Sequence, residues 1–403
     1  MVAFEQSRRK LRGTLGTVPK SRQSLMSPTI PPELFDLVID HLHNEPDALK
    51  ACCIVSKSFV TPARKQLFAH VEFDALRSQL ERWKKSFPDP SRSPARHTRS
   101  LFIYGDHDIT AADTGVGGWV RTFHNVTHLE LMWMNRASFI TFHGLSRSVR
   151  SLTLTESLTT EVFDLLCSFP LLEDLALNTL SPESDTYRWN PPQTSPKLTG
   201  TLDLRMDGRA HTITRRWLDF PNGLRFSKIY VLFLEEDIGP VVDLVSECSD
   251  TLECLTVQHF PMSAFPSAPV TASTSPFLSD VEVPSVVFLD LSKATKLKHL
   301  RFLRTRIKST VRWITMTLQT VDSKTLQSIT IDPHSAIPET VEEEVYQEWQ
   351  DLDRLLVQFW TSHSIRPKVK YVPRWGEGRE LRDDAQILLP ELTKRGLVDL
   401  VGT

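Results

Sequence analysis

The sequence predicts an α + α/β protein: a small helical module near the N-terminus, a repetitive body of short parallel strands and helices, and a C-terminal helical cap. Three observations predict these parts. Apolar residues recur at helical spacing between residues 30 and 73, short alternating apolar pairs recur between residues 99 and 335, and a long amphipathic pattern follows residue 336. With 403 residues, the chain is long enough for two or three such units.

The bulk composition excludes some classes of function. The chain has 47 Lys and Arg and 49 Asp and Glu residues, so its formal net charge of −2 creates no overall field that attracts nucleic acid or an anionic membrane. It has no run of about 18 apolar residues, so we expect no membrane-spanning helix. The five cysteines are odd in number and lack the spacing of a disulfide framework or a zinc site. We therefore expect a reducing compartment, the cytoplasm or the nucleus.

Residues 1–29 form a basic segment that lacks the apolar core of a secretory signal. Its charged residues are one acid, Glu5, and six bases: Arg8, Arg9, Lys10, Arg12, Lys20 and Arg22. We interpret this segment as a disordered tail, with an organelle presequence or a nuclear signal as the alternative.

Residues 30–73 are expected to form three short helices. Pro31 and Pro32 favour a helix start, and Leu34, Leu37 and Leu42 follow at helical spacing. Further helices are expected from about residue 47 and from about residue 56. A domain this small cannot bury all its apolar side chains by itself. The surplus must therefore meet either the rest of the chain or another protein.

Four stretches of this module resemble the F-box family. They are Pro31-Pro-Glu-Leu, Leu37-Val-Ile-Asp-His-Leu, Leu49-Lys-Ala-Cys-Cys-Ile-Val-Ser-Lys-Ser-Phe and Pro62-Ala-Arg-Lys-Gln-Leu-Phe. The resemblance is specific because these stretches match the family pattern in register over about 40 residues. Phe59 stands where the family usually has tryptophan, so the aromatic ring is kept and the N–H donor is lost.

The resemblance implies a partner, the small Skp-type adaptor of cullin–RING ubiquitin ligases, and through it the cullin. It also implies which side chains supply apolar contacts to the adaptor or pack behind those contacts: Pro32, Leu34, Ile39, Leu42, Leu49, Cys53, Val55 and Phe59. Residues 74–98 are expected to form one more amphipathic helix and a linker.

Nine alternating apolar pairs between residues 99 and 335 predict short strands. The pairs are Leu101/Ile103, Leu129/Leu131, Leu152/Leu154, Leu175/Leu177, Leu202/Leu204, Val231/Phe233, Leu255/Val257, Leu300/Phe302 and Ile329/Ile331. Six of the pairs have an apolar residue three positions earlier, and most steps span 20–29 residues. Several pairs also follow a helical pattern. The body therefore resembles an irregular leucine-rich-repeat solenoid, with an unrelated α/β domain containing coincidental leucine pairs as the alternative.

One step of this body is longer, at 45 residues. It contains residues 260–284, rich in Pro, Ser and Thr, which we interpret as a protruding loop. Leu289 and Leu291, with Val286 before them, could add one more strand there.

The residues that flank the buried pairs are expected to line a concave face that binds a protein substrate. The candidates are Glu130, Met132, Thr153, Asn178, Asp203, Arg205, Gln258, Arg301 and Asp332. Their mixture of charge signs and polar groups suits protein recognition better than phosphate binding.

Residues 336–403 begin with an acidic amphipathic pattern, in which residues 339–353 contain seven acids and no Lys or Arg. We expect a helix that caps the last repeat, with a site for a basic partner as the alternative. Residues 289–300, 313–321 and 359–369 resemble the C-terminal half of F-box-like proteins from mushroom-forming fungi. That resemblance implies a shared architecture and no particular substrate.

Motifs that would indicate catalysis are missing: the sequence has no G-x-S-x-G, P-loop or H-E-x-x-H pattern. The triplet Asp106-His-Asp lacks a recognisable nucleophile, and the loop Gly115-Val-Gly-Gly lacks the rest of a dinucleotide fingerprint. We expect no cofactor, no metal and no enzymatic activity. The expected function is that of a substrate-recognition subunit of a cullin–RING ligase. The alternatives are an interaction scaffold not coupled to ubiquitination and, least favoured, an enzyme.

Overall fold

The computed structural model describes residues 31–74, 76–105, 118–134, 139–143, 145, 147–155, 160–179, 196–206, 223–233, 239–259, 288–305, 311–321, 324–333, 343–363, 365, 368–371 and 386–400. The basic segment of residues 1–29, the motifs at residues 106–108 and 115–117, and the loop of residues 260–284 lie outside these described residues. The chain divides into two compact units, Met1–Gln66 and Leu67–Thr403.

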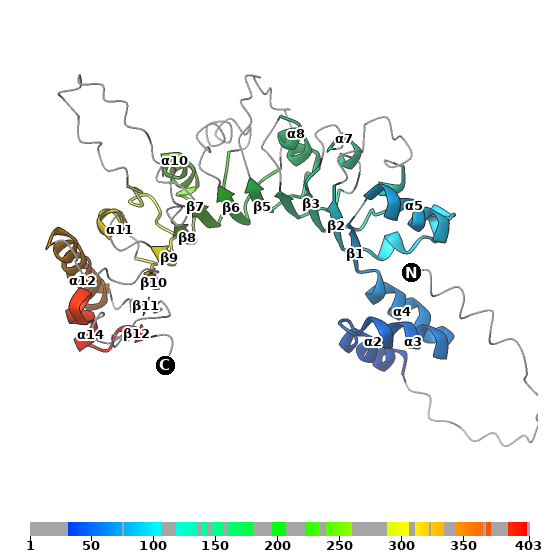
Figure 1. Ribbon diagram of the computed structural model, residues 1–403, viewed down its shortest axis with the longest axis horizontal. Helices are drawn as coiled ribbons and strands as arrows, with labels where there is room; N and C mark the ends of the chain where they lie inside the picture. Colours follow the sequence, from blue (N-terminus) through cyan, green and yellow to red (C-terminus); the bar gives the residue numbers. More distant parts are fainter. Residues whose placement is uncertain are drawn as a thin grey trace, which may run out of the picture. The chain divides into compact units, whose positions relative to one another are not determined.

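The first unit contains three helices, at the positions that the helical spacing predicts. They are α2 (Pro32–His41), α3 (Pro46–Val55) and α4 (Lys57–Leu67) (Figure 1). α2 and α3 each have a proline in the first turn. N–H groups there have no acceptor within the helix, so the N–H that proline lacks costs no hydrogen bond.

Helices α2 and α4 are joined by an aromatic contact and a polar contact. The rings of Phe35 and Phe59 meet edge to face with centroids 4.9 Å apart, and the Gln66 Nε2 donates to Asp40 Oδ1 at 2.5 Å. Ile39 of α2, Leu49 of α3 and Ala63 of α4 are buried and form the small core of this unit.

The second unit is a mixed α/β structure built on one parallel sheet. Among the described residues the sheet has twelve strands, and each strand pairs with the next one along the chain. The strands are β1 (His70–Phe73), β2 (Ser100–Tyr104), β3 (His128–Met132), β4 (Ser151–Thr155), β5 (Asp174–Thr179), β6 (Thr201–Met206), β7 (Lys228–Phe233), β8 (Cys254–His259), β9 (His299–Thr305), β10 (Ser328–Pro333), β11 (Lys368–Tyr371) and β12 (Val398–Leu400).

Helices connect many of these strands. They are α5 (Leu76–Ser86), the 3-10 helices η1 (Pro90–Arg92) and η2 (Pro94–His97), α7 (Phe139–Phe142), α8 (Thr160–Ser168), α10 (Gly239–Cys248), α11 (Val311–Gln319), α12 (Glu343–His363) and α14 (Pro390–Lys394). Within the second unit the strands follow an arc, and α7, α8 and α10 lie on its outer side (Figure 1). None of the helices in the described part of the chain is long and apolar enough to cross a membrane.

Two rows of apolar side chains run across the sheet in register and form its core. One row is Leu101, Leu129, Leu152, Leu175, Leu202, Ile229, Leu255, Leu300 and Ile329, and the other is Ile103, Leu131, Leu154, Leu177, Leu204, Val231, Val257, Phe302 and Ile331. No side chain of either row is more than 4% exposed, so the alternating pairs are the buried face of the sheet.

A recurring hydrogen-bond pattern marks the amino-terminal edge of the strands. The carbonyl two residues before the first buried apolar residue accepts two consecutive N–H groups from the next repeat, as Arg99 O does from Thr127 and His128. The step from β5 to β6 differs, because the Asp174 carboxylate accepts the Thr201 N–H at 2.6 Å. A Cβ at Gly200 would lie 2.3 Å from the same carboxylate oxygen, so a side chain there would displace the bond.

The structure corrects four expectations. The buried pair of β7 is Ile229 and Val231 rather than Val231/Phe233, since Ile229 is the residue in register with Leu202. Leu289 and Leu291 form no strand; they are buried in a loop whose N–H groups donate to Thr317 Oγ1 and Thr320 Oγ1 of the α11 region.

The sheet is also longer at both ends than its apolar pairs predict. β1 lies within the stretch assigned to the helical module, and the sheet therefore begins before residue 99. Beyond the expected helix α12, the chain adds β11, α14 and β12, so residues 336–403 contain strands as well as helices.

Candidate functional site

The first candidate surface is an apolar face on the helical unit. Leu34, Leu37 and Val38 occupy neighbouring positions on one side of α2, and they are 49%, 55% and 56% exposed. Phe35 and Ile39 point from another side of the helix into the unit. α2 therefore has two apolar sides, and this small unit has a core for only one of them.

Helix α3 carries a second exposed apolar set at its C-terminal end. Ile54 and Val55 are 70% and 77% exposed, whereas Leu49 of the same helix is buried. Among the described residues nine large hydrophobic side chains are exposed, and five of them lie on α2 and α3. We call these five the apolar face: Leu34, Leu37, Val38, Ile54 and Val55. Such a concentration on two short helices is typical of a surface that binds a protein.

The structure separates the eight adaptor-binding candidates into two groups. Leu34 and Val55 are exposed and belong to the apolar face. Ile39 and Leu49 are buried, and Leu42, Cys53 and Phe59 are half-buried, so none of these five belongs to the exposed apolar face. The side chain of Pro32 lies outside the described residues. Leu37, Val38 and Ile54 were missed as candidates, although a helical projection of α2 separates Leu37 and Val38 from Ile39.

The thiol of Cys53 fits a packing role. Burial raises its pKa, while the nearby Arg64 guanidinium of α4 opposes that shift. A thiol with a raised pKa forms little thiolate and is a weak nucleophile. The five cysteines of the chain are all free thiols in the structure.

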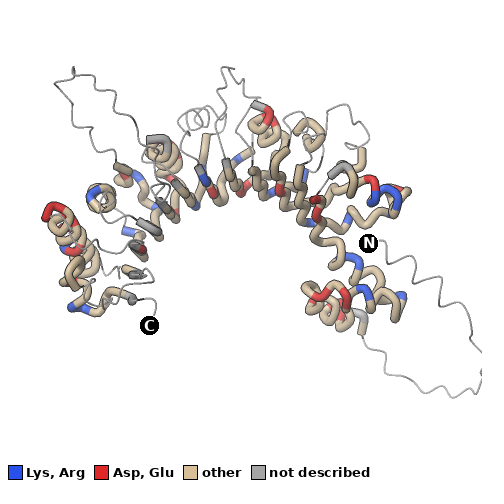
Figure 2. The backbone as a smooth tube through the Cα atoms, viewed as in Figure 1, with Lys and Arg blue, Asp and Glu red and all other residues tan. Residues whose placement is uncertain are grey.

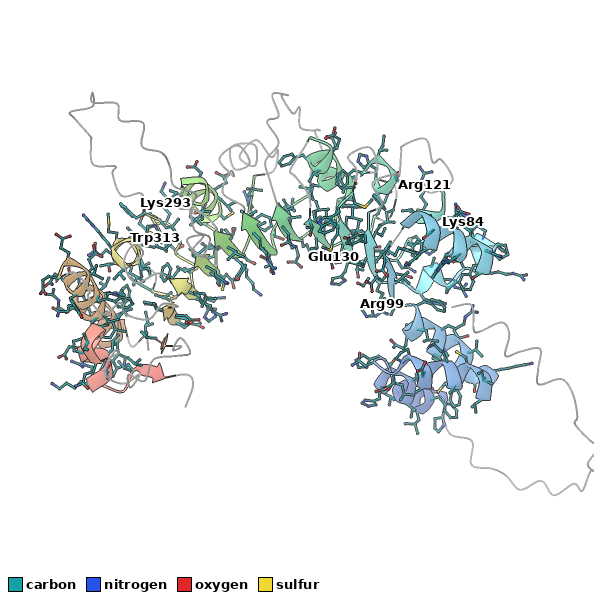
Figure 3. All side chains as sticks on the ribbon, in the orientation of Figure 1. Lys84, Arg99, Arg121, Glu130, Lys293 and Trp313 are labelled. Atoms are coloured by element: carbon teal, nitrogen blue, oxygen red, sulfur yellow. The ribbon has the colours of Figure 1, made fainter. Side chains whose placement is uncertain are left out.

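The second candidate surface is the side of the sheet that points away from the core rows. We call it the strand face: it contains the side chains of β1 to β10 that alternate with the buried pairs. Figure 3 shows Glu130 projecting from β3 on the side away from α7 and α8. The nine substrate candidates all lie on this face, because each alternates with a buried residue of its strand.

The register groups these candidates into three neighbourhoods. Glu130 and Thr153 are direct partners on β3 and β4, with Met132 beside them. Asn178 and Arg205 are partners on β5 and β6, and Arg205 also forms an ion pair with Asp203 at 3.4 Å.

The third neighbourhood lies on β8 to β10. Gln258 pairs in register with Leu303 of β9, which pairs with Asp332 of β10, and Arg301 lies beside them. Gln258 is buried and accepts a hydrogen bond from the Tyr230 hydroxyl, so its amide is already engaged within the protein. Arg301 is exposed.

The carboxyl ends of β2 and β3 present an aromatic pair that the sequence patterns did not indicate. The rings of Tyr104 and Trp133 lie with centroids 5.0 Å apart, and Trp133 is 41% exposed. Trp133 has a φ of 53°, a left-handed conformation that is unfavourable for a bulky residue. Gly105 packs against its backbone so closely that a Cβ would lie 2.1 Å from the Trp133 carbonyl oxygen.

Two carboxylates lie on the strand face near this pair. Glu72 of β1 and Glu130 of β3 are both in register with Phe102 of β2, one on each side. The pKa of Glu72 is raised, first by a hydrogen bond with the neighbouring Asp74 and then by burial, and burial raises the pKa of Glu130. Glu72 was missed as a candidate because β1 itself was missed.

The described residues contain no group of three or more His, Cys, Asp or Glu side chains placed to hold a metal ion. Fold and surfaces together define a mixed helical and parallel-sheet protein with two candidate binding surfaces. Compared with models of protein families, the sequence matches none, and it matches no curated protein.

Proposed function

We propose that this protein is the substrate-recognition subunit of a cullin–RING ubiquitin ligase. Its F-box, made of α2 to α4, binds a Skp-type adaptor, and its leucine-rich-repeat solenoid binds a protein substrate through the strand face. The observation that carries the proposal is the apolar face, five exposed aliphatic side chains on two helices whose sequence resembles an F-box. Covering that face on an adaptor would remove its apolar surface from water.

The proposed mechanism is proximity. A receptor that holds a substrate near a charged ubiquitin-conjugating enzyme raises the effective concentration of the substrate's lysines. No side chain of this chain takes part in bond chemistry. The strand face supports the substrate-binding role because its exposed and half-buried side chains mix charges, amides and aromatic rings, which is typical of a protein-binding surface.

The test is binding of the purified full chain to a purified Skp-type adaptor, with and without Leu34→Ala combined with Val55→Ala. Both side chains are exposed, so their truncation leaves the core of the helical unit intact. Since central apolar anchors contribute about 2 kcal/mol or more each, the double variant is expected to lose at least tenfold in affinity. Phe59 is a poorer choice because its ring packs on Phe35.

The matched control is Ile140→Ala combined with Ile387→Ala, which removes two exposed isoleucines of the second unit. It should bind the adaptor like the wild type. Equal adaptor binding by both double variants, at equal thermal stability, would refute the proposal. If purified cullin does not join the complex of the full chain with the adaptor, the alternative function of an interaction scaffold not coupled to ubiquitination is supported instead.

A further inference from the structure

The sign of the charged side chains on the strand face changes along the sheet. From β1 to β5 its described side chains include the acids Glu72, Glu130 and Asp174, with Asp74 directly after β1, and no Lys or Arg. Arg205, Lys228 and Arg301 follow on β6, β7 and β9. Figure 2 marks the charged residues of each strand. The first half of the face therefore carries a negative potential that is not neutralised by cations on the same strands.

Nearby arginines do not remove this potential. Arg99 and Arg150 lie just before β2 and β4, at the amino-terminal edge of the strands, whereas Glu72 and Glu130 lie toward the carboxyl ends. Arg150 also forms an ion pair with Glu173 at 2.6 Å. The Asp174 carboxylate is engaged by the Thr201 N–H. Glu72 and Glu130, on either side of Phe102, remain as the acids of the face toward the carboxyl ends of the strands.

The acidic half of the face ends at β6, where Arg205 is the first cation. The Oδ1 atoms of Asn178 and Asp203 are buried and have no hydrogen-bond partner among the described residues. The two residues lie on adjacent strands, where Ala176 is in register with Asp203 and Asn178 with Arg205. Both Oδ1 atoms are buried and the other Asp203 carboxylate oxygen pairs with Arg205 at 3.4 Å, so these two residues mark the end of the acidic half and are not contacts for a ligand.

The aromatic pair indicates the chemistry of a ligand for the acidic half of the face. The Trp133 ring is exposed and packs beside Tyr104 at the carboxyl ends of the strands. Cations, and arginine above all, are attracted to the faces of such rings. A guanidinium supplies five N–H donors and can stack on a ring while it pairs with a carboxylate. One ligand group thus matches both the acids and the rings.

We propose that the strand face from β1 to β5, around Glu72, Glu130, Tyr104 and Trp133, binds an extended arginine-rich segment of a substrate protein. Four steps between strands of about 4.8 Å each span roughly 19 Å, the length of about six extended residues. The inference rests on the proposed function in one respect: the segment belongs to a substrate only if the protein is a substrate receptor. Binding of the segment itself requires no adaptor.

The test is fluorescence anisotropy with a labelled octapeptide of alternating arginine and serine, titrated with the full chain. The wild type is expected to bind it at least tenfold more tightly than an octapeptide of alternating glutamate and serine, with an affinity that falls as salt is added. Glu72→Gln combined with Glu130→Gln should weaken binding at least tenfold. Trp133→Gly, which removes the ring and also relieves the left-handed backbone, should weaken it severalfold.

The matched control is Glu343→Gln combined with Glu344→Gln, which removes two exposed acids from α12 and should leave binding unchanged. Equal losses in the two glutamine variants, or no binding of the arginine peptide by the wild type, would overturn the proposal. These outcomes leave adaptor binding unaffected, so a failure here is distinguishable from a failure of the adaptor test.

Two further measurements exclude other occupants. If Arg8→Gln, Arg9→Gln and Lys10→Gln together raised peptide affinity tenfold or more, the chain's own basic segment would be the occupant. If light scattering showed a dimer that dissociates in the Glu72/Glu130 variant, a second copy of the chain would be the occupant. Either result would overturn the assignment to a separate substrate, and unchanged affinity with a monomeric mass supports it.

Discussion

At the scale of single residues, Asp353 shows how one buried carboxylate organises the C-terminal region. α14 begins at Pro390, preceded by Leu389, whose side chain cannot accept a hydrogen bond. The first-turn N–H groups of a helix need acceptors. Asp353 of α12 supplies them: its two oxygens accept the N–H groups of Glu391 at 2.8 Å and Leu392 at 3.0 Å. A cap usually provided by the preceding residue comes here from a different helix.

Replacing Asp353 by alanine is therefore expected to destabilise the second unit by about 1–3 kcal/mol, the typical cost of leaving buried polar groups unpaired. Urea denaturation followed by circular dichroism measures this cost. Asp351→Ala on the same helix is the control, because Asp351 is an exposed partner of Arg354 and should change stability by less than about 1 kcal/mol. Equal effects of the two substitutions would contradict this role of Asp353.

The same prediction has a pH dependence. Burial raises the pKa of Asp353, and the two N–H groups oppose that shift. A carboxyl whose folded pKa lies above its unfolded value contributes stability below the unfolded pKa and loses it as the pH rises through the folded pKa. The deficit of Asp353→Ala should consequently be largest in acid and shrink as the pH rises.

At the scale of elements, strands β1 to β10 combine a buried side and an outward side within four to seven residues. β4 is the clearest example: Leu152 and Leu154 lie in the two core rows, while Ser151 and Thr153 point to the strand face. Because side chains alternate along a strand, a shift of register by one residue would exchange the two sides. The leucine pairs therefore also decide which residues are available to a ligand.

Leu154→Ala is expected to destabilise the second unit by about 2–5 kcal/mol, since it leaves a cavity in a packed core. Thr153→Ala, the adjacent residue on the other side of the strand, should cost less than about 1 kcal/mol. Denaturant midpoints of the two variants measure the difference. Similar costs would mean that the two sides of β4 are not distinct in burial.

At the scale of the whole molecule, the chain joins a small helical unit to a much larger sheet unit. Units that have cores of their own can unfold separately. The helical unit has only a few buried side chains, among them Ile39, Leu49 and Ala63, and leaves its apolar face in water. A partner that covers that face would stabilise this unit by mass action, by about 2.7 kcal/mol at a hundred times its dissociation constant.

Calorimetry of the full chain is accordingly expected to show two transitions, of which the less stable one belongs to the helical unit. Leu49→Ala should lower only this transition, and added Skp-type adaptor should raise only this one. A single transition that Leu49→Ala shifts as a whole would show that the two units unfold cooperatively.

The sequence by itself determined the elements whose apolar spacing is periodic. The three N-terminal helices, α5, α12 and eight of the nine apolar pairs lie where their patterns predict, because a buried face repeats at every second residue in a strand and at three or four in a helix. The buried pair of β7 was predicted wrongly because Ile229, Val231 and Phe233 alternate equally well in the sequence. Only the pairing with Leu202 and Leu204 of β6 shows that Ile229 and Val231 are the buried residues.

Only the tertiary structure decided which apolar residues stay exposed and which polar residues share one surface. Leu34 and Ile39 are equally apolar and lie on one helix, yet one is exposed and the other buried, because burial depends on what packs against each side. Glu72, Tyr104, Trp133 and Asp203 are far apart in the chain and carry no local motif. They share a surface because a parallel sheet in chain order places successive strands side by side.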